Sequence, residues 1–211
     1  MVNLFNGLKY PFFHIIIGVL SISRFFSIAY GISLLIGIYF IIRESHKSNI
    51  AIYWVMYAVG AEVFLRITHG NIFHEYIKYL SILFFITAFI VEKNIFKVNK
   101  KYIVYILLLL VSIFFVRYET FSQIRQQISF NLSGPILLGI ASIYFYRRSV
   151  HLDELLNSLY CLILPLISTL TYILFYTPDI SSIIFTSAAN SVTTAGGGSN
   201  QGSTILGFGI F

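Results

Sequence analysis

The stretch that decides the fold class is LLNSLYCLILPLISTLTYILFY, residues 155–176, which contains no Asp, Glu, Lys or Arg. It is longer than the roughly 20 residues that a helix needs to cross a bilayer. A helix that is apolar on every side has no face for water and is typical of a membrane span. Residues 155–176 therefore predict a transmembrane helix.

Similar apolar stretches recur along the rest of the chain. Only 10% of all residues are charged and 57% are hydrophobic, whereas about 25% of residues are charged in a soluble domain. The predicted crossings are residues 11–23, 25–42, 50–67, 76–91, 102–116, 132–146 and 155–176. The fold class is therefore all-α, a polytopic transmembrane helical bundle with about seven crossings plus the start of another, forming a single domain over residues 1–211.

The first of these stretches, residues 11–23, is short and leaves two interpretations open. It is the first helix of a hairpin, or it lies in the membrane interface. A cleaved signal peptide fits less well, because SISRFF at residues 21–26 is a poor cleavage site and another apolar stretch follows at once.

The basic residues alternate between successive breaks in the apolar pattern. Because cytoplasmic loops carry an excess of Lys and Arg, these breaks are predicted to be cytoplasmic. They hold Arg43 and Lys47, then Lys93, Lys97, Lys100 and Lys101, then Arg147 and Arg148. The opposite breaks, residues 69–71, 117–130 and 177–204, are then expected to face the outside.

The composition also disfavours several classes of function. The net charge of +6 resides mainly in these breaks, which indicates topology signals and no nucleic-acid partner. The single cysteine, Cys161, cannot form an internal disulfide and is expected to pack in the core. No nucleotide-binding or HExxH motif occurs, and the spacing of His69, His74 and Glu75 fits no common zinc motif, so no metal is predicted.

Glu62 and Arg66 are spaced four residues apart in the third predicted crossing. This spacing places them on one helix face, where they can pair. Ionisable groups at bilayer depth face a bundle interior or a cavity. The pair is therefore either a structural ion pair between helices or part of the lining of a substrate cavity.

The predicted second outer loop holds Arg117 and Arg125, against the positive-inside bias. A guanidinium matches phosphate bidentately. Asn131 or Ser133 can cap the next helix with Pro135 in its first turn, and a helix N-terminus attracts anions. These residues predict an outer anion site; the alternative is a solvated loop followed by an ordinary helix cap.

Residues 177–204 form a predicted outer loop rich in Gly, Asn, Ser and Thr, after which only ILGFGIF remains up to Phe211. Long loops of this kind are commonly functional or disordered. The final apolar residues are about a third of a crossing. We therefore expect the chain to be the N-terminal part of a longer protein, and a stop codon directly after Phe211 would contradict this.

Within this loop, GGGSNQGSTILG at residues 196–207 resembles the glycine-rich outer loop of the O-antigen ligase and O-antigen polymerase family. GAEVFLR at 60–66, FNLSGP at 130–135 and YFYRR at 144–148 are similar to the same family. The Phe and Pro that often accompany the glycine turn in the family are absent here. The resemblance extends over most of this chain and about the first half of a typical member.

The resemblance implies a multi-pass glycosyltransferase of the bacterial inner membrane. Such enzymes take glycan from a polyprenyl-pyrophosphate donor at the periplasmic face and transfer it to a lipid A core or to another glycan repeat, without nucleotide or other cofactor. The family's candidate base is a histidine in a large outer loop expected beyond residue 211, so the resemblance assigns no catalytic residue here. The substrate-binding residues expected from these arguments are Arg117, Arg125, Asn131, Glu62, Arg66, Asn200 and Gln201, the last two for glycan contact or loop order.

Two other classes remain open from the residues alone. One is a polysaccharide or lipid exporter or permease without transferase chemistry, and the other is a purely structural membrane subunit. No internal repeat of the kind common in transporters is evident in the sequence.

Overall fold

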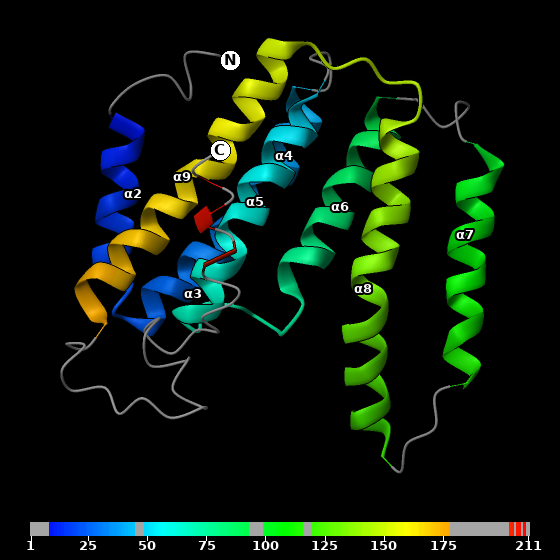
Figure 1. Ribbon diagram of the computed structural model, residues 1–211, viewed down its shortest axis with the longest axis horizontal. Helices are drawn as coiled ribbons and strands as arrows, with labels where there is room; N and C mark the ends of the chain where they lie inside the picture. Colours follow the sequence, from blue (N-terminus) through cyan, green and yellow to red (C-terminus); the bar gives the residue numbers. More distant parts are fainter. Residues whose placement is uncertain are drawn as a thin grey trace. The chain divides into compact units, whose positions relative to one another are not determined.

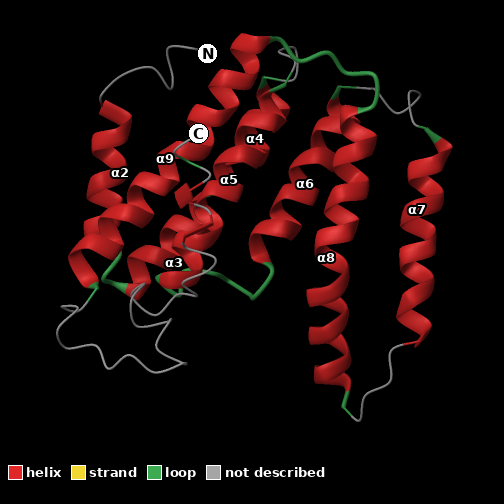
Figure 2. Cartoon of the chain, viewed as in Figure 1, coloured by secondary structure: helices red, strands yellow, loops and turns green. Residues whose placement is uncertain are grey.

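The structure is a computed structural model that describes residues 9–44, 49–92, 99–115, 120–177, 203–204, 206–207 and 209. Within these residues every regular element is a helix, and no strand is present (Figures 1 and 2). The helices are α2 (Lys9–Leu20), α3 (Arg24–Ser33), α4 (Ile36–Arg43), α5 (Ile50–Ile67), α6 (Tyr76–Val91), α7 (Lys100–Val111), the 3-10 helix η2 (Ser112–Phe115), α8 (Phe121–Phe145) and α9 (Leu152–Tyr176). The all-α prediction is confirmed for the described part of the chain.

Four helical segments in the described residues are long and apolar enough to cross a membrane: Arg24–Arg43, Ile50–Ile67, Phe121–Phe145 and Leu152–Tyr176. The apolar helices Tyr10–Leu20 and Tyr76–Val91 are shorter. The chain thus has the helices of a membrane protein, while the number of crossings stays a prediction.

The predicted bounds hold for two helices and differ for the others. α5 and α6 begin and end where the apolar stretches do. The stretch 25–42 is divided between α3 and α4 at Leu34 and Leu35, whose amides donate to Gly31 and Ile32, three residues back. This tighter pattern interrupts the regular bonding of an α-helix.

The largest difference concerns α8, which begins at Phe121, so most of the predicted outer loop 117–130 is helical. The predicted caps Asn131 and Ser133 are wrong, because both lie inside the helix together with Pro135 and the N-cap residue is Thr120. Proline in a helix interior leaves one carbonyl without its usual donor, but membrane helices tolerate it. Pro135 therefore does not mark a helix start.

The contacts divide the chain into two compact units. Unit 1 comprises Met1–Leu35, Met56–Ile72 and Leu152–Phe211, and unit 2 comprises Ile36–Val55 and Phe73–His151.

Unit 1 is held together by close helix contacts and a buried hydrogen-bond chain. Gly18 of α2 lies against Ser168 of α9, and small residues of this kind let membrane helices approach closely. His14 Nδ1 lies 2.9 Å from Ser168 Oγ, and His14 Nε2 lies 3.4 Å from the hydroxyl of Tyr57. The hydroxyl of Tyr30 donates to that of Tyr57 at 3.0 Å. These polar groups satisfy one another inside an apolar bundle.

In unit 2, α6, α8 and α7 lie side by side, with α8 in contact with both neighbours (Figure 1). The hydroxyl of Tyr79 near the start of α6 bonds Ser129 near the start of α8, and Tyr144 near the end of α8 bonds Glu92 directly after α6. α6 and α8 end at the same end of the unit, so α7, which connects them, runs in the opposite direction. It lies on the side of α8 away from α6 (Figure 1), and its start packs by Tyr102 against Tyr146. The two ends of the unit therefore differ: the hydroxyls of Tyr79 and Ser129 pair at one end, and Tyr144 bonds the carboxylate of Glu92 at the other.

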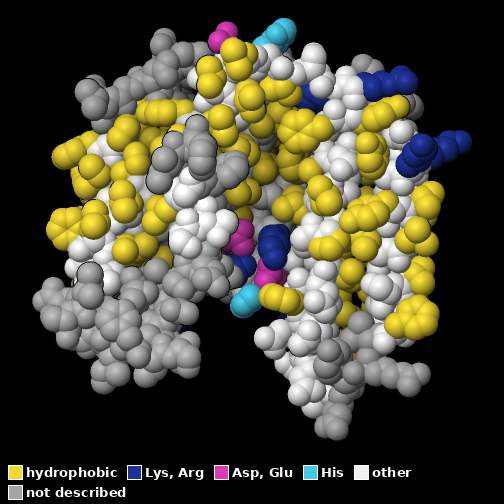
Figure 3. Space-filling model, viewed as in Figure 1, with side chains coloured by type: hydrophobic (Ala, Val, Ile, Leu, Met, Phe, Trp, Pro, Cys, Tyr) yellow, Lys and Arg dark blue, Asp and Glu magenta, His cyan; other side chains and the backbone are white. Residues whose placement is uncertain are grey.

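The side chains of α7 are largely exposed and apolar, with Leu107 56% and Leu108 66% exposed. Figure 3 shows hydrophobic side chains along this helix and basic side chains at the end where it begins. Exposed apolar surface of this extent is typical of a helix that contacts lipid.

Candidate functional site

A cavity of about 560 Å³ lies in unit 2 where α6 and α8 begin. One wall is formed by the turn before α6 and its first residues, and the other by the first turns of α8. The lining residues are Phe73, His74, Glu75, Tyr79, Phe121, Ser122, Ile124, Arg125, Gln126, Ile128 and Ser129. The cavity is thus an apolar cleft with a few polar groups, the usual character of a ligand site.

Two hydrogen bonds fasten the walls together. The hydroxyls of Tyr79 and Ser129 lie 3.0 Å apart. Deeper along α8, buried Ser133 donates to Glu75 Oε2 at 3.4 Å. Each bond joins α8 to α6 or to the residue directly before it, so the relative position of the two walls is set inside the unit.

Glu75 is the buried charge of this site, with its side chain only 1% exposed. Its Oε1 lies 2.7 Å from Nδ1 of His74, and its Oε2 lies 2.5 Å from Nζ of Lys78. A buried carboxylate is costly unless it is paired and hydrogen-bonded, and Glu75 is both. Both carboxylate oxygens of Glu75 therefore have a partner.

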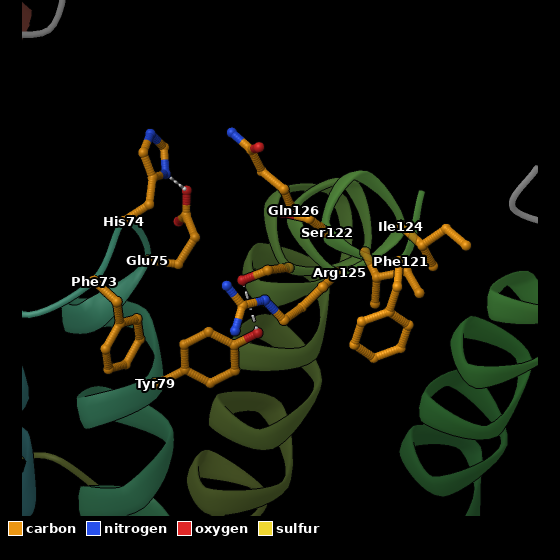
Figure 4. A pocket seen from close by; sticks show the side chains of 11 residues that line it. Phe73, His74, Glu75, Tyr79, Phe121, Ser122, Ile124, Arg125 and Gln126 are labelled. Atoms are coloured by element: carbon orange, nitrogen blue, oxygen red, sulfur yellow. Dashed lines mark hydrogen bonds and ion pairs between the residues drawn. The ribbon is translucent and has the colours of Figure 1, made fainter. Parts of the chain in front are cut away.

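Arg125 is different, since its guanidinium forms no hydrogen bond or ion pair within the described part of the chain. Figure 4 shows its side chain reaching from α8 toward Tyr79 of α6. Among the described residues, the positive charge of Lys78 balances the negative charge of Glu75 (+1 − 1 = 0), which leaves the charge of Arg125 at the cavity. The cavity can thus accept an anionic group.

The position of Arg125 along α8 places it near the edge of the apolar region. Residues 122–127 of this helix are mostly polar, and residues 128–145 are mostly apolar. At 1.5 Å per residue the apolar part is about 27 Å long, close to the ~30 Å of a bilayer core. Arg125 lies about 5 Å beyond this part, and a bilayer core that covered residues 128–145 would place it among the lipid headgroups.

The opposite end of unit 2 has a balanced charge cluster. Arg148 forms an ion pair with Glu92 and donates to Asn49 Oδ1 at 3.1 Å. These three residues come from the breaks that hold Lys47, Lys93 to Lys101 and Arg147, which the charge pattern placed on one side of the membrane. The contacts bring Asn49, Glu92 and Arg148 together at one end of unit 2, and the cytoplasmic location of the three breaks stays a prediction.

Of the predicted site residues that the structure describes, one lines the cavity and the others lie elsewhere. Arg125 lines the cavity, on a helix instead of a loop. Asn131 lies exposed on α8 and is not among the lining residues. Glu62 and Arg66 form the predicted pair at 2.7 Å in unit 1 and do not line this cavity. Arg117, Asn200 and Gln201 lie outside the described residues.

Several cavity residues were not predicted. His74 and Glu75 were considered only as metal ligands, and Tyr79 and Ser129 were not considered. A usable signal existed on α8, because Ser122, Arg125, Gln126 and Ser129 follow the spacing i, i+3, i+4 and i+7. That period indicates a polar helix face.

Comparisons of this chain with protein-family models, with curated proteins and with solved structures found no match in any of the three. The argument for function therefore depends on the cavity and its charges.

Proposed function

We propose that the chain forms part of a membrane glycosyltransferase of the O-antigen ligase or polymerase type. It takes glycan from a polyprenyl-pyrophosphate donor at the periplasmic face of the bacterial inner membrane and transfers it to a hydroxyl of a lipid A core or glycan acceptor. The observation that supports this most is Arg125, a guanidinium without a partner in the described residues, in a cavity at the polar end of α8.

The charge of the cavity suits a pyrophosphate. A guanidinium presents donors in a fork that matches two phosphate oxygens at once. The hydroxyl of Ser122 and the amide of Gln126 line the same cavity and can bond further phosphate or sugar oxygens. A cavity of about 560 Å³ is within the common range of small-molecule sites, roughly 300–1,000 Å³.

The surroundings of the cavity suit a lipid-linked donor. Phe130 and Leu138, within the apolar part of α8, are 58% and 62% exposed. A prenyl chain can lie along such apolar surface while its pyrophosphate stays at headgroup depth beside Arg125. A nucleotide-linked sugar has no long apolar chain that could contact this surface.

The chemistry needs the leaving group to be stabilised. When the acceptor oxygen attacks the anomeric carbon, the bond to the pyrophosphate breaks and negative charge grows on the leaving oxygen. A positive group already in place at that point stabilises the transition state. Arg125 is assigned this task.

The test is transfer of glycan by the complete gene product in nanodiscs, with polyprenyl-pyrophosphate-linked oligosaccharide as donor and a lipid A core or glycan as acceptor. Hydrogen bonds to charged groups contribute about 1.5–3 kcal/mol, so Arg125→Ala is expected to lower kcat/KM about 10- to 100-fold. Arg125→Lys is expected to recover part of it.

Arg147→Ala is the matched control. Arg147 is exposed, at the opposite end of unit 2 from the cavity, with its guanidinium over the ring of Tyr146. We expect this variant to transfer glycan at the wild-type rate. Equal rates for Arg125→Ala and Arg147→Ala would reject the phosphate role, and the absence of transfer by the wild type with every acceptor would reject the proposed function.

A second candidate is an exporter or permease for lipid or polysaccharide, favoured by the interruption at Leu34 and Leu35. It falls near the middle of the span Arg24–Arg43, and helices broken in mid-membrane are common at transporter binding sites. Movement of labelled polyprenyl-linked glycan across proteoliposomes, without any new glycosidic linkage, would favour this candidate over the transferase.

A further inference from the structure

We infer that the rings of Tyr79 and Phe73 form a platform that binds the first sugar of the donor, the one bonded to the pyrophosphate. The inference rests on the proposed function and deepens it, because it assigns the residues that recognise the glycan part of the donor. Both residues bind this sugar and take no part in the bond change.

The two aromatic side chains line the same wall of the cavity. The ring centroids of Phe73 and Tyr79 lie 5.7 Å apart, and both side chains are accessible, Phe73 being 47% and Tyr79 40% exposed. Figure 4 shows the two rings next to each other on the α6 side of the cavity. The cavity therefore has a continuous aromatic surface facing the first turns of α8.

This aromatic surface is fixed before a ligand arrives. The ring of Tyr76, a side chain only 5% exposed, packs in a T-shaped contact against Phe73 with the centroids 5.5 Å apart. The hydroxyl of Tyr79 is bonded to Ser129 Oγ at 3.0 Å, which holds the second ring from the other helix. A surface that is already ordered loses little conformational entropy on binding.

The platform lies next to the arginine assigned to the pyrophosphate. Ser129, the partner of Tyr79, comes one helical turn after Arg125 on the same face of α8, where Cβ atoms are about 5–6 Å apart. Figure 4 shows the side chain of Arg125 extending toward Tyr79. Because the first sugar is bonded directly to the pyrophosphate, a donor whose phosphate binds Arg125 has that sugar beside the ring of Tyr79.

The chemistry of the two walls suits a pyranose. One face of such a sugar consists mainly of C–H groups, which carry a small positive charge and pack against the negative face of an aromatic ring. The sugar hydroxyls lie at the ring edge, where the hydroxyl of Ser122 and the amide of Gln126 from α8 can bond them. The aromatic wall therefore favours a lipid pyrophosphate that carries sugar over one that does not.

The experiment is a binding cycle between the aromatic ring and the sugar, with the complete gene product in nanodiscs. Kd is measured for two labelled ligands, polyprenyl pyrophosphate with its oligosaccharide and the same lipid without sugar. In the wild type the sugar is expected to tighten binding about 10-fold, the size of one favourable contact with an aromatic ring. Tyr79→Leu is expected to remove this preference and to leave binding of the sugar-free lipid unchanged.

Matched variants separate contact with the ring from the other role of Tyr79. Tyr79→Phe loses the bond to Ser129 but keeps the ring, so we expect it to retain most of the preference for sugar. Phe73→Leu, in the turn before α6, is expected to lower the preference about 3-fold, and it provides the same test should Tyr79→Leu fail to fold. Tyr39→Leu is the control, because Tyr39 of α4 is 57% exposed and does not line the cavity, and we expect it to bind both ligands as the wild type does.

Three results would overturn the platform. They are a full preference for sugar in both Tyr79→Leu and Phe73→Leu, an equal loss of binding for the two ligands, and an equal loss of preference in Tyr79→Leu and Tyr79→Phe. The second result is the one expected if these rings only anchor the helix at the membrane interface.

The two proposals are tested separately. Arg125→Ala is expected to weaken binding of both ligands alike, so a failed platform with this result keeps the pyrophosphate site and the proposed function. A wild-type protein that binds neither ligand removes both proposals.

Discussion

Adding a single methyl group to Gly18 tests the close contact between α2 and α9. A Cβ at Gly18 would lie 2.8 Å from the carbonyl oxygen of Ser168 and 2.8 Å from Cβ of Thr171. Carbon atoms in contact are normally about 3.5–4.0 Å apart, so the two helices would have to separate by about 0.7 Å.

The magnitude follows from two opposing effects. Overpacking of this kind costs about 1–3 kcal/mol, while replacing glycine by alanine in a helix gains about 1 kcal/mol. Gly134 of α8 is the matched control, because a Cβ there would have nothing within 4 Å. Gly18→Ala is thus expected to be less stable than Gly134→Ala by about 2 kcal/mol.

The assay is reversible unfolding in mixed micelles with increasing SDS, followed by circular dichroism. Gly134→Ala should unfold at the wild-type SDS fraction or slightly above it, and Gly18→Ala below it. Identical midpoints for the two variants would refute the close contact of α2 with α9.

The same unfolding assay tests two further predictions. Glu92→Gln and Arg148→Met each leave the other charge of the pair without its partner, in side chains that are 11% and 12% exposed. Each variant is expected to lower the free energy of unfolding by about 3 kcal/mol, and the double variant by less than the sum of the two. Strict additivity of the two losses would argue against the pair. Ser168→Ala removes the hydroxyl that bonds both the ring and the carbonyl of His14 and is expected to cost about 1–3 kcal/mol. Ser142→Ala, whose exposed hydroxyl bonds only its own helix, is expected to change stability by less than about 0.5 kcal/mol, and equal losses in the two serine variants would count against the buried bonds.

Arg125 within α8 and Arg148 directly after it illustrate how the same residue type serves different purposes. Arg148 has its charge matched by Glu92 and donates a second hydrogen bond to Asn49, which is the arrangement of a structural cluster. Arg125 has no such partner in the described residues. The difference in partners, more than the residue type, marks Arg125 as the candidate ligand-binding group.

The apolar pattern was sufficient to predict α5 and α6 with their bounds. A run of apolar residues between polar breaks must satisfy its own backbone hydrogen bonds in lipid, and a helix does so. The pairing of Glu62 with Arg66 followed from their spacing. The interruption at Leu34 and Leu35 could not be predicted, because the stretch around it is mostly apolar and contains no proline.

The start of α8 was missed for a different reason. A helix that extends beyond the apolar core has polar residues in its outer turns, and their composition is the same as that of a loop. A loop over residues 117–130 would have no fixed geometry relative to α6, so the sequence alone does not relate Arg125 to that helix. The meeting of His74 and Arg125 across one cavity depends on how α6 and α8 are rotated about their axes, which hydrophobic periodicity alone does not determine.

The most direct test of the central claim is to determine on which side of the membrane the cavity opens. In a Cys161→Ala background, which removes a cysteine that is 0% exposed, single substitutions Gln126→Cys and Arg147→Cys are treated with a membrane-impermeant maleimide in right-side-out vesicles. The account predicts that Gln126→Cys is labelled in intact vesicles and that Arg147→Cys is labelled only after permeabilisation. The reverse pattern would contradict a cavity that meets its lipid-linked donor at the outer face.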